Sequence, residues 1–142
     1  MLFAANRWEK DGEIRTLRNA GTLVVADRYT WSNVVYGLSQ GLEEAWLRRL
    51  EDGLQEADVT LLVDITAAES RRRKAQERDD YERDPRLLEE ARSHYVRFAR
   101  QRDWVVLDGE APAVQVSAQA ILALETRLGP RIPELQRTRG GA

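Results

Sequence analysis

The chain has 142 residues, enough for one domain with a hydrophobic core. Its 22 basic and 24 acidic residues nearly balance, which argues against a generally basic nucleic-acid-binding protein. The absence of cysteine excludes disulfides and thiolate metal sites, and the single histidine excludes a multi-histidine site. No apolar run approaches the roughly 18 residues of a membrane span, and no signal peptide is visible, so we expect a soluble, cytoplasmic protein without a membrane partner.

The first predicted element is a helix over residues 2–10. Phe3 and Arg7 are four residues apart and therefore share one helical face, where a ring and a guanidinium could stack on a planar base and donate to its edge. In the alternative interpretation, Phe3 belongs to the core and Arg7 pairs with a glutamate. Asp11-Gly12 is expected to break the helix. A second helix over residues 13–20 should then end at Gly21.

A short apolar run over Leu23–Ala26 predicts a strand that is buried on both faces of a parallel sheet. Asp27 and Arg28 follow it directly. Ligands bind at the carboxyl ends of strands in open α/β sheets, and an arginine fork beside a carboxylate suits phosphate chemistry. The alternative is a structural ion pair at the end of a strand.

The remaining pattern alternates between helices and strands, which indicates an α/β fold. Asp84 should cap a helix that has Pro85 in its first turn. The charged run from Arg71 to Arg83 fits either a solvated helix or a segment that covers phosphates. Helices are expected at residues 30–36, 42–54, from Ala67, from Asp84 and at 113–128, and strands at 59–64 and 104–107.

Two motifs occur early in the chain, FAANRWE at residues 3–9 and ADRY at residues 26–29. They are followed by the later apolar runs, which end in aspartate. The set resembles thymidylate kinase, a nucleoside monophosphate kinase of the P-loop class, over about residues 2–128. The resemblance implies a three-layer α/β/α parallel sheet of the P-loop NTPase type. That family sheet has five strands, of which three are visible here.

One departure concerns the phosphate loop. No G-x-x-x-x-G-K-[ST] motif occurs in the chain, whose two lysines, Lys10 and Lys74, follow no glycine loop. The resemblance therefore implies an N-terminally truncated thymidylate kinase-like domain over residues 1–128, lacking its first strands and P-loop. Residues 129–142 are expected to be a disordered tail.

The resemblance also assigns the acceptor side of the site. The matching phenylalanine and arginine of the family stack on thymine and reach the base carbonyl, which implies these roles for Phe3 and Arg7. Asp27 would lie beside the metal and the reacting phosphates, and Arg28 would hold the acceptor monophosphate. Two further residues are implied to lie near the nucleoside, Ser32 and Tyr36.

The donor side is implied by the charged run and by the last strand. The run resembles the family lid, in which Arg73 and Arg78 would contact ATP phosphates and Tyr81 would lie on the nucleoside side. The catalytic residues implied by the resemblance are thus Asp27, Arg28, Arg73 and Arg78. The loop after the last strand would border the adenine through Gly109, Glu110 and Ala111.

The function that follows from the resemblance is transfer of the ATP γ-phosphoryl to dTMP, giving dTDP, with Mg²⁺ as cofactor and a homodimer as the expected assembly. A non-catalytic remnant that binds thymidine nucleotides or a partner is the alternative from another class. A related deoxynucleoside kinase is a third possibility, against which FAANRWE argues.

Overall fold

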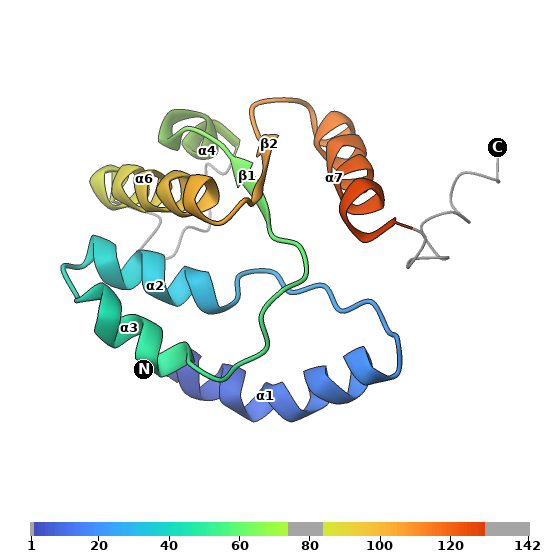
Figure 1. Ribbon diagram of the computed structural model, residues 1–142. Coiled ribbons are helices and arrows are strands. Elements are labelled where there is room, and N and C mark those ends of the chain that lie inside the picture. The colour runs from blue at the N-terminus through green and yellow to red at the C-terminus, as the bar shows by residue number, and fades with distance from the viewer. Residues whose placement is uncertain (1, 74–83, 130–142) are drawn as a thin grey trace, which may run out of the picture. The chain divides into compact units, whose positions relative to one another are not determined.

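The computed structural model describes residues 2–73 and 84–129 (Figure 1), and it divides the chain into two compact units. The first unit comprises residues 1–56 and the second residues 57–142. Helices dominate both, and the second unit contains a small parallel sheet. The predicted α/β class is therefore confirmed at this level. No helix within the described ranges is long and apolar enough to cross a membrane.

The first unit is a group of three helices, α1 (Leu2–Asn19), α2 (Thr30–Ser39) and α3 (Glu44–Glu51). The helices α2 and α3 are neighbours joined by a short turn (Figure 1). A Cβ atom at Gly37 would lie 2.5 Å from Leu47 Cδ2, so the glycine is what allows α3 to approach α2 this closely. The buried apolar side chains of the unit are Ala4, Val34, Val35, Leu47 and Leu54.

The predicted break at Asp11-Gly12 is wrong, because α1 runs through both residues. Asp11 accepts a hydrogen bond from Arg15 one turn later, at 2.5 Å from Nε to Oδ2, and this pair supports the helix across the glycine. The predicted end at Gly21 is confirmed. Gly21 has φ of 77°, and the amides of Gly21 and Thr22 donate to the carbonyls of Arg18 and Leu17, the two bonds of a Schellman motif.

The predicted strand at Leu23–Ala26 is wrong, since residues 22–26 are extended without strand pairing. Leu23 is 41% exposed and Val25 is 83% exposed, so the expected burial on both faces is absent too. An extended segment becomes a strand only when a neighbour accepts and donates its backbone hydrogen bonds. Within the described residues of this unit, no segment does so for residues 22–26.

The second unit is built on two parallel strands, β1 (Leu61–Asp64) and β2 (Val105–Asp108). Leu61 pairs with Val105 and Asp64 pairs with Asp108, so both strands end in an aspartate at the same edge. The described helices of the unit are α4 (Ala67–Arg73), α6 (Pro85–Gln101) and α7 (Ala113–Leu128). In Figure 1, α6 lies to one side of the strand pair and α7 to the other.

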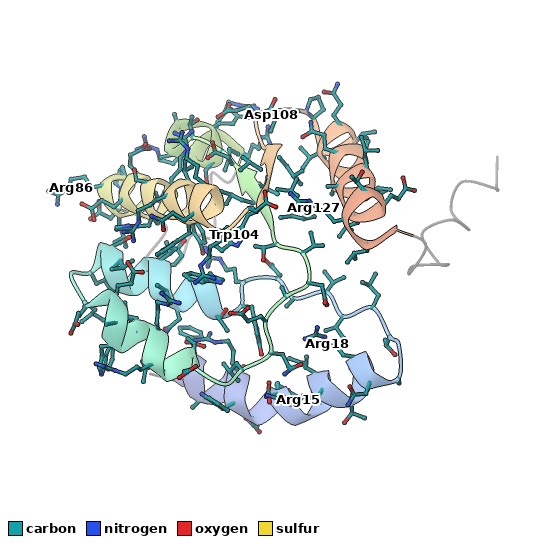
Figure 2. The ribbon with its side chains drawn as sticks, in the orientation of Figure 1. Arg15, Arg18, Arg86, Trp104, Asp108 and Arg127 are labelled. Atoms are coloured by element: carbon teal, nitrogen blue, oxygen red, sulfur yellow. The ribbon has the colours of Figure 1, made fainter. Side chains whose placement is uncertain are left out.

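Local signals in this unit agree with the sequence. Asp84 caps α6 by accepting a hydrogen bond from the Arg86 amide at 2.9 Å, and Pro85 occupies the first turn, as predicted. Among the described residues of the unit, the buried apolar side chains that form the core are Ala91, Phe98, Ala99, Leu107 and Ala111. On α7, Arg127 donates to Asp103 at 2.6 Å, just before Trp104 and β2 (Figure 2). This ion pair helps to hold α7 beside β2.

Candidate functional site

Arg28 has an uncommon backbone conformation. Its φ of 57° lies in the left-handed region, where a non-glycine residue is strained by about 1–3 kcal/mol. The strained residue follows the exposed Asp27 and precedes Tyr29, the N-cap residue of α2. Such strain concentrates at ligand sites, because the surrounding structure holds the residue in place for a purpose other than stability.

The Arg28 side chain lies on the first two turns of α2. Its Nη2 donates to the Tyr36 hydroxyl at 2.6 Å, and its Cζ lies 5.0 Å from the centre of the Tyr36 ring. The contact uses one of five N–H donors, and within the described part of the chain the others have no protein partner. Because Arg28 is exposed, these donors can receive an anionic ligand.

Phe3 and Arg7 are on the first two turns of α1 but have different surroundings. Phe3 is 71% exposed, so the alternative interpretation that placed it in the core is wrong. The Arg7 side chain is only 11% exposed and forms a double hydrogen bond with Glu51 of α3. The other half of that alternative, the pairing of Arg7 with a glutamate, is confirmed. This pairing uses one edge of the guanidinium and does not block ligand binding at the rest.

Glu51 is a residue that the sequence did not single out. It stands 44 residues after Arg7, and its carboxylate accepts hydrogen bonds from Arg7 Nε at 2.8 Å, from Arg7 Nη2, and from Asn33 Nδ2 at 2.8 Å. Its side chain is 6% exposed. Spacing along one helix could not reveal this contact, because it joins three helices. A charged residue at an inward position of α3 was the available signal.

Tyr29 contributes a buried hydroxyl to the same unit. Among the described residues, Tyr29 Oη is the one buried side-chain nitrogen or oxygen without a hydrogen-bond partner. Burial raises the pKa of Tyr29, and the nearby Asp11 carboxylate adds to the effect. The hydroxyl is therefore neutral at physiological pH. Ser32 lies in the first turn of α2, where its amide donates to the Tyr29 carbonyl at 3.1 Å.

Two arginines of α1 attach the last residues of the unit to this helix (Figure 2). Arg15 bonds both Asp11 and the Gly53 carbonyl, the latter at 2.8 Å. Arg18 donates to the Gln55 side chain and the Glu56 carbonyl, both at 3.0 Å. The hydrogen bond from Arg15 keeps the pKa of Asp11 below its ordinary value. These contacts attach the segment that follows α3 to α1.

In the second unit, Arg73 lies against the loop after β2. Its Nη2 donates to the carbonyl oxygens of Glu110 at 2.9 Å and Ala111 at 3.3 Å. The Glu110 carboxylate accepts a bond from the Thr66 amide at 3.0 Å, which lowers the pKa of Glu110. The structure therefore brings together Arg73 and the loop from Gly109 to Ala111. The resemblance implied that both contact ATP.

Gly109 is required at the close approach of this loop to β1. Its amide donates to the Asp64 carbonyl at 2.8 Å, and an added Cβ would lie 2.5 Å from the same oxygen. Asp64 itself pairs with Arg92 of α6, so it does not cap α4. Thr66 caps that helix, with its hydroxyl accepting from the Glu69 amide at 3.2 Å.

The remaining predicted site residues are not brought together by the described structure. Arg78 and Tyr81 lie outside the described residues. Asp27 is exposed, and within the described ranges no group of three or more histidine, cysteine, aspartate or glutamate residues could hold a metal ion. A single carboxylate still suits Mg²⁺, which is usually bound by one or two carboxylates together with substrate phosphates.

Comparison with known proteins identifies one family. The family described as thymidylate kinase matches residues 1–121. The thymidylate kinase of Dictyostelium discoideum is 34% identical over 73 residues, which are 51% of this chain and 33% of the relative. That of Arabidopsis thaliana is 35% identical over 83 residues, or 58% of this chain and 32% of the relative.

A longer match is with the probable thymidylate kinase of Thermococcus kodakarensis, which is 29% identical over 133 residues. This match covers 91% of the chain and 65% of the relative. The chain thus spans about one third of the two eukaryotic relatives and somewhat under two thirds of the archaeal one.

Proposed function

This chain belongs to the thymidylate kinase family, and from that premise we propose that it acts as a nucleoside monophosphate kinase. The reaction transfers the γ-phosphoryl group of ATP to dTMP and gives dTDP. The observation that carries the proposal is Arg28, a strained, exposed arginine of the ADRY motif whose open donors suit a phosphate.

The acceptor side of the proposed site belongs to the first unit. Arg28 binds the phosphate of dTMP, and Phe3, exposed at the start of α1, stacks on the base. Arg7 donates to the base carbonyl. Ser32 and Tyr36 lie beside the nucleoside.

The donor side belongs to the second unit and to residues outside the described ranges. The loop from Gly109 to Ala111 borders the adenine, and the contact of Arg73 with this loop supports their common role. Arg73 and Arg78 contact the phosphates of ATP, and Tyr81 lies towards the nucleoside. Asp27 would hold Mg²⁺, which when bound neutralises phosphate charge.

The chemical contribution of these residues is placement and charge stabilisation. The nucleophile is an oxygen of the dTMP phosphate, so no side chain needs to form a covalent intermediate. Arginine N–H groups can donate to the equatorial oxygens of the transferred phosphoryl group, over which negative charge is spread in the transition state. Arg28 fixes the attacking phosphate, and the stacked base fixes the nucleoside, so the acceptor is held at two points.

The fuller architecture is also part of the proposal. Residues 1–128 form a thymidylate kinase-like domain of the three-layer P-loop NTPase type, and the tail expected at residues 129–142 lies, apart from Gly129, outside the described residues. By the same family argument the protein is a cytoplasmic homodimer whose partners are dTMP and ATP, without nucleic-acid or membrane partners.

A second candidate is binding without transfer. The 142 residues contain no G-x-x-x-x-G-K-[ST] motif, which in P-loop kinases holds the β- and γ-phosphates of ATP. A chain limited to these residues would bind dTMP and bind ATP poorly. A deoxynucleoside kinase, which acts on an uncharged nucleoside, fits less well with an Arg28 that is open to a phosphate.

The test is an assay for ATP-dependent formation of dTDP from dTMP, with thymidine as a second acceptor. We expect transfer to dTMP and none to thymidine, and Arg28→Ala should lower kcat/KM for dTMP at least tenfold. Binding of dTMP without any transfer would support the second candidate. Transfer to thymidine alone would overturn the proposal in favour of a deoxynucleoside kinase.

A further inference from the structure

Arg7 is held at one edge and open at the other. Glu51 occupies its Nε and Nη2 donors, and within the described part of the chain Nη1 has no hydrogen-bond partner. Nη1 is nevertheless not sealed inside the protein, because Tyr29 Oη is the only buried side-chain nitrogen or oxygen among the described residues that lacks a hydrogen-bond partner. Glu51 therefore clamps the guanidinium along one edge and leaves three of its five N–H groups unbonded, two on Nη1 and one on Nη2.

Glu51 determines the direction of these free donors. A carboxylate that binds Nε and Nη2 together fixes the plane of the guanidinium as well as its position. Asn33 bonds the same carboxylate from α2, so Glu51 has little freedom of its own. The side chains of Arg7 and Glu51 are 11% and 6% exposed, which limits screening by water.

The free edge of Arg7 can donate and cannot accept a hydrogen bond. Facing position 4 of a pyrimidine ring, it suits a carbonyl there, as in thymine, and opposes an amino group there, as in cytosine. A freely rotating arginine could turn away from the amino group and would discriminate weakly. A clamped arginine leaves the wrong base with two facing donors and no partner.

We propose that Glu51 is a specificity-determining positioning residue, which clamps Arg7 so that the site accepts a 4-oxo pyrimidine nucleotide and rejects a 4-amino one. The inference rests on the proposed function, because it assumes that the base lies at Arg7. It goes further in assigning the selection to a residue of α3 that does not touch the nucleotide. The entropy of fixing Arg7 is already lost in the free protein, so binding does not have to supply it.

The test compares the affinities of dTMP and dCMP for the full chain by calorimetry. In Glu51→Gln, the amide group would point a donor at Arg7 or Asn33, and the clamp would be lost. We expect dTMP affinity to fall about tenfold and dCMP affinity to change little, so that the preference for dTMP falls about tenfold. Glu43→Gln, which removes an exposed carboxylate just before α3, is the matched control and should keep the preference.

A second comparison shows whether Glu51 acts through Arg7. The double variant Arg7→Ala, Glu51→Gln should bind dTMP no more weakly than Arg7→Ala alone. A merely structural role would instead lower the affinities for dTMP and dCMP together and would add to the effect of Arg7→Ala. Either of these results, or an unchanged preference in Glu51→Gln, would overturn the inference and leave the proposed function standing.

Failure of the proposed function gives a different result, since the wild-type chain would then show no preference for dTMP. If Glu51→Gln does not fold, the wild-type protein still provides a test by NMR. The Arg7 Nε–H signal, assigned by its loss in Arg7→Lys, should exchange slowly with water and shift when dTMP is added. Exchange as fast as that of Arg86, whose side chain is 91% exposed, would show that there is no clamp and overturn the inference.

Discussion

Arg92 of α6 donates two hydrogen bonds to Asp64 at the carboxyl end of β1, with Nε–Oδ1 at 2.7 Å and Nη2–Oδ2 at 3.0 Å. The two side chains are 34% and 24% exposed, so water screens the pair only in part. The bond to Asp64 raises the pKa of Arg92 further, and the arginine is charged at every relevant pH. The pair therefore attaches α6 to the strand edge at which the Gly109 loop begins.

Replacing Arg92 with alanine should lower the free energy of unfolding by about 1–2 kcal/mol, because Asp64 would lose both bonds while remaining partly buried. Arg86→Ala is the control, since Arg86 is on the same helix (Figure 2) and its side chain is 91% exposed. It should change stability by less than about 0.5 kcal/mol. Urea denaturation measures both, and equal effects would contradict a specific role for the pair.

Gly109 provides a second test of the same strand edge. In Gly109→Ala the new Cβ would lie 2.5 Å from the Asp64 carbonyl oxygen, a backbone atom that cannot move aside easily. We expect a loss of about 1–3 kcal/mol. Gly12→Ala is the matched control, because Gly12 lies inside α1 with no atom within 4 Å of an added Cβ. That change should stabilise the chain by about 0.5–1 kcal/mol. Denaturation experiments on both variants should therefore give changes of opposite sign in the free energy of unfolding.

Acid should weaken the contacts of Glu69 over a defined range of pH. Hydrogen bonds from Arg72, and then from Arg73, lower the pKa of Glu69 from 4.5 to about 2 in the folded protein. The lowered pKa means that the stabilisation is complete above about pH 4.5 and is lost as the pH falls towards 2.

The measurement is the free energy of unfolding of wild type and Glu69→Gln between pH 6 and about pH 3. The wild-type curve should fall more steeply below the ordinary carboxyl pKa. Other carboxylates with lowered pKa, Asp11, Asp103 and Glu110, act in both proteins and cancel in the comparison. Parallel curves would show that the two arginines do not hold Glu69 in solution.

Substitutions at Arg28 should affect the free energy of unfolding and the affinity for dTMP differently. Glycine adopts φ near 57° without strain, so Arg28→Gly should leave the free energy of unfolding unchanged or raise it by up to about 1 kcal/mol. The same change removes the phosphate donor and should weaken dTMP binding at least tenfold. Arg28→Lys retains charge without the planar fork, and we expect intermediate affinity. Thermal unfolding with dTMP titration checks both effects, and a large loss of stability in Arg28→Gly would argue for a structural role.

Features that depend on residues close together in the sequence were predictable, and features that depend on distant residues were not. The cap at Asp84 and the helix end at Gly21 depend on residues one to five positions apart, and both were predictable. The continuation of α1 through Asp11-Gly12 was not predictable, because Asp11 is held by Arg15 and by the amide of Gln55, 44 residues away. Turn propensity is weaker than such tertiary support.

The site shows the same limit. The run Leu23–Ala26 has the composition of a buried strand, but pairing requires a neighbouring segment, which composition cannot supply. The spacing of Phe3 and Arg7 predicted that they share one helical face, and the resemblance to the family assigned them to the site. Glu51 was not identified, because its contacts with Arg7 and Asn33 arise only when three helices pack together. Arg73 and the Gly109 loop were both named, but their direct contact appears only in the structure.

The most direct measurement is a calorimetric titration of dTMP into the 142-residue chain and into its Phe3→Ala and Arg28→Ala variants. We expect saturable binding to the wild type, at least tenfold weaker binding to each variant, and unchanged binding to Glu43→Gln. Absence of dTMP binding to the wild type, or equal affinity in all four proteins, would contradict an acceptor site formed by Phe3 and Arg28.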